Sequence, residues 1–268
     1  MINRADELAW LTSHLSQEQR QLLVLYGRRR VGKTTLVTTA LEDVDATSIY
    51  YLCDQRGSRH NAQRFAARCA DAFDDVRPAV DDFVEAFQYL TARVDGPCII
   101  ALDEFSYLVS DDDTIPSVFQ TIVDDVIAET AISLVLCGSS ISMMEEGVLS
   151  YESPLYGRRT GQWKLTPLSF ADVRAFFPNT DIQTQIQIYS VLGGVPAYLE
   201  QFDTDRGLFE NIEEAVLSKG AFLYEEPEFL LRQELREPAT YMAILEAIAG
   251  GATRVTEIAN EIGADASS

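Results

Sequence analysis

One segment of eight residues, 27–34, constrains this chain more than any other feature: it has the sequence Gly-Arg-Arg-Arg-Val-Gly-Lys-Thr. A short apolar run at 22–27 precedes it, and a stretch of helical pattern, 33–41, follows. The two glycines let the backbone curl so that its N–H groups and the helix N-terminus together form an anion site. Lys33 then reaches the β- and γ-phosphates of a nucleotide, and the Thr34 hydroxyl ligates Mg²⁺. The segment therefore predicts a phosphate-binding loop between a buried strand and a helix.

The residues expected to bind the nucleotide are those of this loop and the first helical turn: Gly27, Arg28, Arg29, Arg30, Val31, Gly32, Lys33, Thr34 and Thr35. The three arginines fill positions of the motif that accept any residue. We interpret them as part of the phosphate loop rather than as a nucleic-acid patch. Tyr50 and Tyr51, in the next predicted strand, are interpreted as strand packing rather than as a platform for stacked bases.

The first two-thirds of the chain alternates between short apolar strands and helices. Strands are predicted at 22–27, 47–53, 98–102, 132–137 and 163–168. Helices are predicted at 33–41, 59–73, 81–93 and 115–129. Short apolar strands separated by helices are typical of an α/β fold in which a parallel sheet is covered on both faces.

From residue 169 onward the pattern is helical. Helices are predicted at 170–177, 182–192, 208–217, 228–235, 238–249 and 254–262. The last two are short, amphipathic and joined by a turn that contains glycine, which is typical of the opening of a helix-turn-helix. We therefore predict three domains, at 1–168, 169–236 and 237–268.

An acidic pair, Asp103 and Glu104, directly follows the apolar strand at 98–102. At the end of such a strand, an aspartate can hold Mg²⁺ through water. The glutamate one residue later can orient and deprotonate an attacking water. The pair therefore predicts a metal-binding Asp103 and a catalytic Glu104.

Two serines, Ser139 and Ser140, follow the strand at 132–137. A hydroxyl in this position suits a sensor that reaches the γ-phosphate or the attacking water. Serine is also a preferred residue at a helix N-cap. Both roles can hold here, one for each serine, and we favour Ser139 as the sensor.

These three elements, in this order, resemble an AAA+-type ATPase. More narrowly, the chain resembles a predominantly archaeal family of AAA-type ATPases that is related to the STAND signalling NTPases. Residues 3–8, Asn-Arg-Ala-Asp-Glu-Leu, resemble the N-terminal box of that family. Residues 154–161, continuing to 165–170, resemble its most distinctive stretch, and 193–199 resemble its Gly-x-Pro lid motif. The resemblance covers essentially the whole chain.

The resemblance implies a three-layer α/β/α P-loop NTPase with sheet order 5-1-4-3-2, followed by a helical lid and a winged helix. It implies that Arg158 or Arg159 acts as an arginine finger or as a sensor in cis. Pro196 is expected near the adenine, with Arg4 and Glu7 near the same end. Family members continue beyond this length and complete the winged helix, so we expect a C-terminally truncated chain.

Together these features predict an ATPase that hydrolyses ATP with Mg²⁺ to drive a conformational switch. One alternative is a slow STAND-like nucleotide switch, and another is a regulator in which ATP state controls binding of DNA or a protein partner. A small-molecule kinase fits less well, because of the acidic pair, the lid motif and the absence of an evident acceptor site. An arginine finger used in trans would require a homo-oligomer.

The remaining composition indicates a cytoplasmic protein with no membrane partner. The four cysteines, at 53, 69, 98 and 137, form no CxxC pair and are interpreted as reduced core thiols. No apolar run is long enough to span a membrane. The first 20 residues carry charge throughout and lack the apolar core of a signal peptide.

The charge balance resembles that of proteins from extreme halophiles. Asp and Glu number 42 against 21 Lys and Arg, which gives a formal net charge of −21. Only three of the bases are lysines, Lys33, Lys164 and Lys219. We interpret this acidity as an adaptation to habitat, so it does not exclude a nucleic-acid partner.

We expect the melting temperature to rise as KCl is increased from dilute to molar concentration. The Debye length falls to about 3 Å at 1 M salt, so repulsion among the acidic side chains is screened. Thermal unfolding followed by circular dichroism across a KCl series measures this. A melting temperature that is highest at low salt would contradict the interpretation.

Overall fold

The computed structural model describes residues 3–17, 19–235 and 237–263. The chain divides into two compact units. The first extends to Phe176 and also takes in Gly193–Ala197, whereas the second comprises Phe177–Leu192 and the chain from Tyr198 onward. The predicted domain boundaries at 169 and 237 stay predictions.

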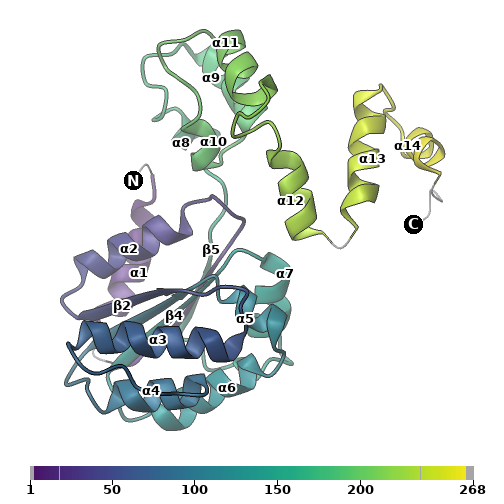
Figure 1. Ribbon diagram of the computed structural model, residues 1–268. Helices are drawn as coiled ribbons and strands as arrows, with labels where there is room; N and C mark the ends of the chain where they lie inside the picture. The colour runs from purple at the N-terminus through teal and green to yellow at the C-terminus, as the bar shows by residue number, and fades with distance from the viewer. Residues whose placement is uncertain (1–2, 18, 236, 264–268) are drawn as a thin grey trace. The chain divides into compact units, whose positions relative to one another are not determined.

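The first unit is built on a five-stranded parallel sheet (Figure 1). Its strands are β1 (Leu22–Tyr26), β2 (Thr47–Leu52), β3 (Cys98–Asp103), β4 (Ile132–Gly138) and β5 (Gly161–Lys164). The order across the sheet is β2-β3-β4-β1-β5, and every pair of neighbours is parallel. This confirms the predicted α/β fold and the strand order 5-1-4-3-2. All five carboxyl ends meet at one edge of the sheet.

Alternate residues of the buried strands point to opposite faces, which produces two separate cores. On one face Val24, Ile100 and Leu134 pack with helices α3 (Ser58–Ala72), α4 (Phe83–Thr91) and α6 (Ile115–Thr121). This core contains a cluster of tilted and edge-to-face phenylalanine rings: Phe65, Phe83, Phe87, Phe105 and Phe119.

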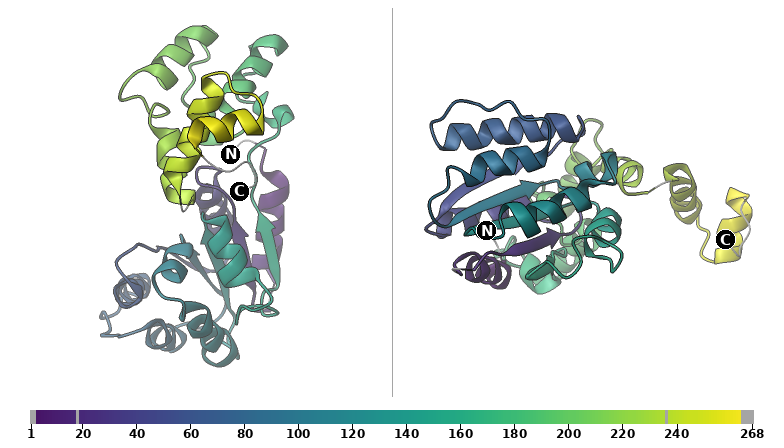
Figure 2. Two further views of the ribbon diagram at one scale, coloured as in Figure 1. Left: turned by 90° about the vertical axis from the view of Figure 1, so that its right-hand side faces the viewer. Right: turned by 90° about the horizontal axis from the view of Figure 1, so that it is seen from below.

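On the other face Leu25, Ala101 and Val135 pack with helices α1 (Ala5–Leu15) and α2 (Lys33–Asp43). The right-hand view of Figure 2 shows the purple α1 on one side of the sheet and the blue helices on the other. The two layers of helices explain why the central strands are apolar without alternation, since neither of their faces meets water.

The structure corrects the predicted fifth strand. The strand spans Gly161–Lys164 instead of 163–168, because Gly161 lies opposite Leu23 of β1 and begins the pairing. This is an edge strand in which half-buried and exposed residues alternate. A prediction that looks for a continuous run of apolar residues therefore places the strand too far along the chain. Pro167, which has no N–H to donate, lies beyond its end.

Two predicted helices are shorter in the structure. The helix predicted at 115–129 consists of α6 and a π-helical turn, η1 (Ile122–Val126). The helix predicted at 170–177 is a single turn, α8 (Phe170–Val173), which begins in a capping box between Ser169 and Asp172. The short α5 (Ser106–Asp111), α7 (Ile141–Met144) and η2 (Glu145–Leu149) complete the first unit.

The chain beyond α8 is helical, as predicted. Its elements are α9 (Ile182–Leu192), α10 (Pro196–Leu199), α11 (Leu208–Ile212), η3 (Glu213–Leu217), α12 (Glu226–Glu234), α13 (Pro238–Ala249) and α14 (Val255–Ile262). Helices α13 and α14 contact each other across a turn with Gly250 and Gly251. They are the two helices predicted for a helix-turn-helix opening, and the winged helix itself stays a prediction.

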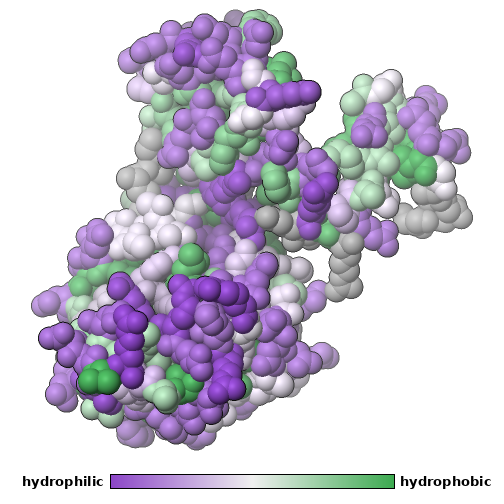
Figure 3. All heavy atoms as spheres, viewed as in Figure 1, coloured by the Kyte–Doolittle hydropathy of each residue, from purple (hydrophilic) through white to green (hydrophobic). Residues whose placement is uncertain are grey.

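The surface differs between the units. Figure 3 shows mostly hydrophilic residues over the face that carries α3 and α4, and patches of hydrophobic residues on the C-terminal helices. Leu245, Ile248 and Val255 there are 46%, 50% and 70% exposed. Within residues 3–17, 19–235 and 237–263, no helix is both long and apolar enough to cross a bilayer.

The four cysteines are buried and free, which confirms them as core thiols. Burial raises the pKa of Cys53, Cys69, Cys98 and Cys137, so each of them stays a neutral thiol. In the described part of the chain, no three His, Cys, Asp or Glu side chains gather as a metal cluster.

Candidate functional site: a phosphate loop at the carboxyl edge of the sheet

The predicted phosphate loop leaves β1 and enters α2. Gly27 has a φ of 155°, and a Cβ added there would lie 2.1 Å from the Leu165 carbonyl oxygen, so no side chain fits. Gly32, with a φ of 100°, turns the chain into α2. Val31 is fully buried in the core beneath α1 and α2. The loop is therefore shaped by two glycines and anchored by one apolar side chain.

Lys33 is 95% buried, and its ammonium lies inside the loop. Its Nζ donates to the carbonyl oxygens of Gly27, at 2.8 Å, and Arg28, at 2.9 Å. Burial lowers the pKa of Lys33, while the neighbouring carboxylates of Glu104 and Asp103 act in the opposite direction. The loop thus holds a positive charge where a phosphate would bind.

The two predicted metal ligands are in direct contact. The Thr34 hydroxyl donates to Asp103 Oδ2 at 2.5 Å. Asp103, the last residue of β3, is 99% buried, and its Oδ1 accepts the Glu104 N–H at 2.9 Å. A carboxylate and a hydroxyl side by side are oxygen ligands of the kind that Mg²⁺ prefers, so these residues fit that ion.

Tyr50 also contacts Asp103, which sequence reasoning missed. Its hydroxyl donates to Asp103 Oδ2 at 2.7 Å. Burial and the hydrogen bond to Asp103 raise the pKa of Tyr50, so the side chain stays a neutral phenol. Our interpretation of Tyr50 as strand packing is therefore incomplete. The available signal was the two-residue period of a strand, which turns Tyr50 and Tyr51 toward opposite faces.

Glu104 and Ser139 are brought together. The Ser139 hydroxyl donates to Glu104 Oε2 at 2.5 Å, and its backbone N–H donates to the same oxygen at 3.4 Å. Glu104 has a φ of 54°, a left-handed conformation that is uncommon outside glycine and is found at functional sites. Ser140 precedes α7 at its N-cap, where its side chain makes no capping hydrogen bond.

Arg4 ties the phosphate loop to the segment after β5. The side chain is 94% buried, and one terminal nitrogen donates to the carbonyl oxygens of Val31, at 3.1 Å, and Thr166, at 2.7 Å. The other bonds Glu7 at 2.8 Å. The Arg4 Nε has no partner among the described residues. These bonds support the shape of the loop, and a contact of Arg4 with the nucleotide stays a prediction.

The other loop residues lie near the surface. The Arg29 guanidinium donates to the Tyr107 hydroxyl in α5 and lies 5.7 Å from the centre of that ring. Arg28, Arg30 and Thr35 are exposed. The loop is thus linked to the helix that follows the acidic pair.

Arg158 and Arg159 are not brought to the phosphate loop. Both precede β5, and their backbone lies at the edge where the strands begin, because Thr160 N–H bonds the Leu22 carbonyl. Arg158 is held by the Asp124 carboxylate at 2.6–2.8 Å. The Arg159 guanidinium donates to the Leu149 carbonyl at 3.1 Å.

Pro196 opens α10, and the glycines before it are tightly packed. The Leu168 N–H donates to the Gly194 carbonyl at 2.7 Å. A Cβ on Gly194 would lie 1.8 Å from the Leu168 carbonyl oxygen. This close approach of two backbones explains why residue 194 is a glycine. A contact between Pro196 and adenine stays a prediction.

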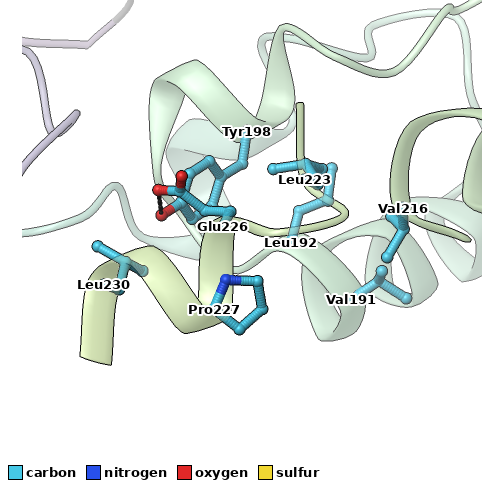
Figure 4. A pocket seen from close by; sticks show the side chains of 8 residues that line it. All are labelled: Val191, Leu192, Tyr198, Val216, Leu223, Glu226, Pro227 and Leu230. Carbon is cyan, nitrogen blue, oxygen red and sulfur yellow. Dashed lines mark hydrogen bonds between the residues drawn. The ribbon is translucent and has the colours of Figure 1, made fainter. Parts of the chain in front are cut away.

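A hollow of about 210 Å³ lies in the helical unit (Figure 4). The side chains that line it are those of Val191, Leu192, Tyr198, Val216, Leu223, Glu226, Pro227 and Leu230. The Tyr198 hydroxyl donates to the Glu226 carboxylate at 2.7 Å, as the dashed line in Figure 4 marks. The rest of the lining is apolar. None of the predicted nucleotide-site residues lines this hollow.

A phosphate loop after β1, an acidic pair at the end of β3 and a serine after β4 of a parallel sheet define a P-loop NTPase. The family model that describes an ATPase domain predominantly from Archaea matches residues 1–202. The chain belongs to this family of archaeal ATPase domains, which confirms the resemblance drawn from the sequence.

A similar curated protein is an uncharacterized one from Methanocaldococcus jannaschii. The two are 36% identical over 262 residues, which cover 98% of this chain and 57% of that protein. The chain therefore spans little more than half the length of this relative.

Two solved structures are similar in fold. The Walker-type ATPase of Pyrococcus abyssi has a TM-score of 0.64 at 22% identity, with 98% of this chain and 84% of that chain covered. The ORC1 protein of Aeropyrum pernix, solved in complex with DNA, has a TM-score of 0.61 at 16% identity, with coverages of 98% and 77%. At these identities the likeness extends to the fold alone.

We expect Gly27→Ala to weaken nucleotide binding about tenfold or more, because overpacking typically costs about 1–3 kcal/mol and the obstructing atoms are backbone. The measurement is the dissociation constant of a fluorescent ADP analogue. Gly207→Ala is the matched control, since a Cβ at Gly207 meets no atom within 4 Å. Equal affinities for the two variants would contradict the packing argument.

Proposed function

We propose that this chain binds ATP together with Mg²⁺, hydrolyses it to ADP and phosphate, and uses the cycle to switch conformation. The observation that carries the proposal is the set of contacts beside the phosphate loop. Thr34 bonds Asp103, and Glu104, the next residue, bonds Ser139. The first contact joins the first turn of α2 to the end of β3, and the second joins the end of β3 to the residue that follows β4. The proposed metal ligands, base and sensor therefore lie next to one another.

The loop and its lysine supply the phosphate site. Inward N–H groups of residues 27–34 and the N-terminus of α2 bind the phosphate oxygens. Lys33, already held inside the loop, neutralises charge on the β- and γ-phosphates. Thr34 and Asp103 would hold Mg²⁺, which neutralises phosphate charge when bound.

Glu104 is the proposed general base. A carboxylate directly after the metal-binding aspartate can orient a water toward the γ-phosphate and take its proton. The Ser139 hydroxyl, bonded to Glu104 Oε2 at 2.5 Å, orients this carboxylate and senses the γ-phosphate. The contact supports Ser139 over Ser140 as the sensor.

An arginine finger is proposed to act in trans. A guanidinium can neutralise charge on the transferring phosphate oxygens. The backbone of Arg158 and Arg159 lies at the sheet edge opposite the chain's own phosphate loop. For either residue to reach a phosphate, a second copy of the chain would have to present it, which makes a homo-oligomer part of the proposal.

A second candidate is a nucleotide-controlled regulator of DNA or a protein partner, with slow turnover. Two observations favour it: the likeness of fold to the ORC1 protein solved with DNA, and the packed helix pair α13–α14. Phosphate release with and without duplex DNA, at a stated salt concentration, discriminates between the two, because DNA affinity depends steeply on salt.

We expect Glu104→Gln to retain ATP binding and to reduce phosphate release by about 10²–10⁴-fold, which is the usual contribution of a general base. The amide keeps the size of the side chain and loses the proton acceptor. Phosphate release from MgATP in molar KCl is measured beside the dissociation constant for ATP.

Glu42→Gln, at an exposed carboxylate near the end of α2, is the control for the loss of one negative charge. It should release phosphate at the wild-type rate. Wild-type turnover in Glu104→Gln would refute the assignment of Glu104 as the base.

We expect Ser139→Ala to slow phosphate release about tenfold, because one hydrogen bond to a charged group is lost. Ser140→Ala should stay close to the wild type, since its side chain makes no capping hydrogen bond. Steady-state rates at saturating MgATP compare the two. A larger loss in Ser140→Ala would transfer the sensor role to Ser140.

A further inference from the structure

Three donors converge on the Asp103 carboxylate. Oδ2 accepts the hydroxyls of Thr34, at 2.5 Å, and Tyr50, at 2.7 Å, and Oδ1 accepts the Glu104 N–H at 2.9 Å. The donors come from α2, from β2 and from the backbone after β3. The aspartate is thus fixed from three directions by separate elements.

Burial makes these bonds necessary. Asp103 is 1% exposed, and a buried carboxylate without partners is strongly unfavourable. An ionised carboxylate has about four acceptor positions on its two oxygens. Among the described residues, three of these positions are used by the donors named above. One acceptor position remains, and it would be the one available to a water on Mg²⁺.

Tyr50 differs from the other two donors in how rigidly it is held. Thr34 is an exposed residue, and its hydroxyl would also have to present an oxygen lone pair to Mg²⁺. The Glu104 N–H belongs to a residue outside the regular strand, whose backbone has a left-handed φ of 54°. Tyr50 stands in the middle of β2, paired with Ala101 of β3, and packs on the core shared with α1 and α2.

We propose that Tyr50 is a positioning residue, which holds the Asp103 carboxylate in the orientation that receives Mg²⁺. The inference rests on the proposed ATPase function. Tyr50 acts through Asp103 and is not assigned a contact with the nucleotide. A carboxylate that is already held in position loses little conformational freedom when the metal binds, so binding is stronger.

The chain offers a matched control one residue away. Tyr51 lies on the opposite face of β2, where its hydroxyl donates to Asn61 Oδ1 at 2.9 Å in the core with α3 and α4. Tyr50→Phe and Tyr51→Phe each remove one hydroxyl and one hydrogen bond from the same strand. Only the first removes a donor from the metal-binding carboxylate.

The test measures the affinity of a fluorescent ADP analogue while Mg²⁺ is titrated from EDTA to saturation. In Tyr50→Phe, the Mg²⁺ concentration at half-effect should rise about tenfold, as expected for one lost bond to a charged group. Affinity in EDTA should equal that of the wild type. Tyr51→Phe should keep the wild-type Mg²⁺ dependence, and thermal melts establish that both variants fold.

A double-mutant comparison separates positioning from general structural damage. In an Asp103→Asn background, adding Tyr50→Phe should not change the Mg²⁺ dependence further, because the residue on which Tyr50 acts has been altered. An additional shift would overturn the proposal. The proposal would also be overturned if the Mg²⁺ concentration at half-effect in Tyr50→Phe were equal to or lower than that of the wild type. The same holds if it were equal to that of Tyr51→Phe.

The response of the wild type to Mg²⁺ separates a failure of the proposed function from a failure of the role proposed for Tyr50. If wild-type nucleotide affinity does not respond to Mg²⁺ at all, the proposed ATPase function fails. If the wild type responds and Tyr50→Phe responds in the same way, the function stands and the role of Tyr50 fails.

Discussion

The hydrogen bond between Thr34 and Asp103 is the interaction on which this site depends, because it joins the helix after the phosphate loop to the end of a strand two places away in the sheet. It forms only if β1, β4 and β3 lie in parallel register with their carboxyl ends at one edge. The layered helices that bury both faces stabilise this register. The geometry of the candidate site therefore depends on the packing of the whole sheet and its helices, although only a few residues form the site.

The same edge explains why each polar residue stands where it does. A side chain that follows a buried strand emerges from an apolar layer and has few neighbours with which to bond. Asp103 bonds Thr34 and Tyr50, and Glu104 bonds Ser139. Arg4 performs a related task at the loop, where its buried guanidinium binds backbone carbonyls from two segments that are distant in sequence. Mutual satisfaction of these groups orders the site before any ligand arrives.

Most of the fold could be predicted from the sequence, because the short apolar strands and the phosphate motif are strong local signals. β5 was harder to place, since an edge strand buries only one side and its pattern is weak. The strand order implied by the resemblance places the ends of β3 and β4 side by side, but it does not report that the Glu104 and Ser139 side chains bond each other there. Tyr50 was missed because strand order alone does not report which side chains of neighbouring strands bond: the residue that Tyr50 contacts is 53 positions away. Arg158 could be recognised as a motif residue, whereas its bond to Asp124 depends on tertiary contacts.

The backbone of Glu104 is left-handed, a conformation that favours glycine, whereas the proposed role of this residue needs a carboxylate. Strain of this kind costs on the order of 1–3 kcal/mol in a residue that has a side chain. Glycine would relieve it and would also remove the carboxylate. If Glu104 is the base that we propose, stability and catalysis are opposed at residue 104, and a selection for thermal stability alone would tend to replace it. The acid at this position is a residue that the fold tolerates and that the proposed reaction requires.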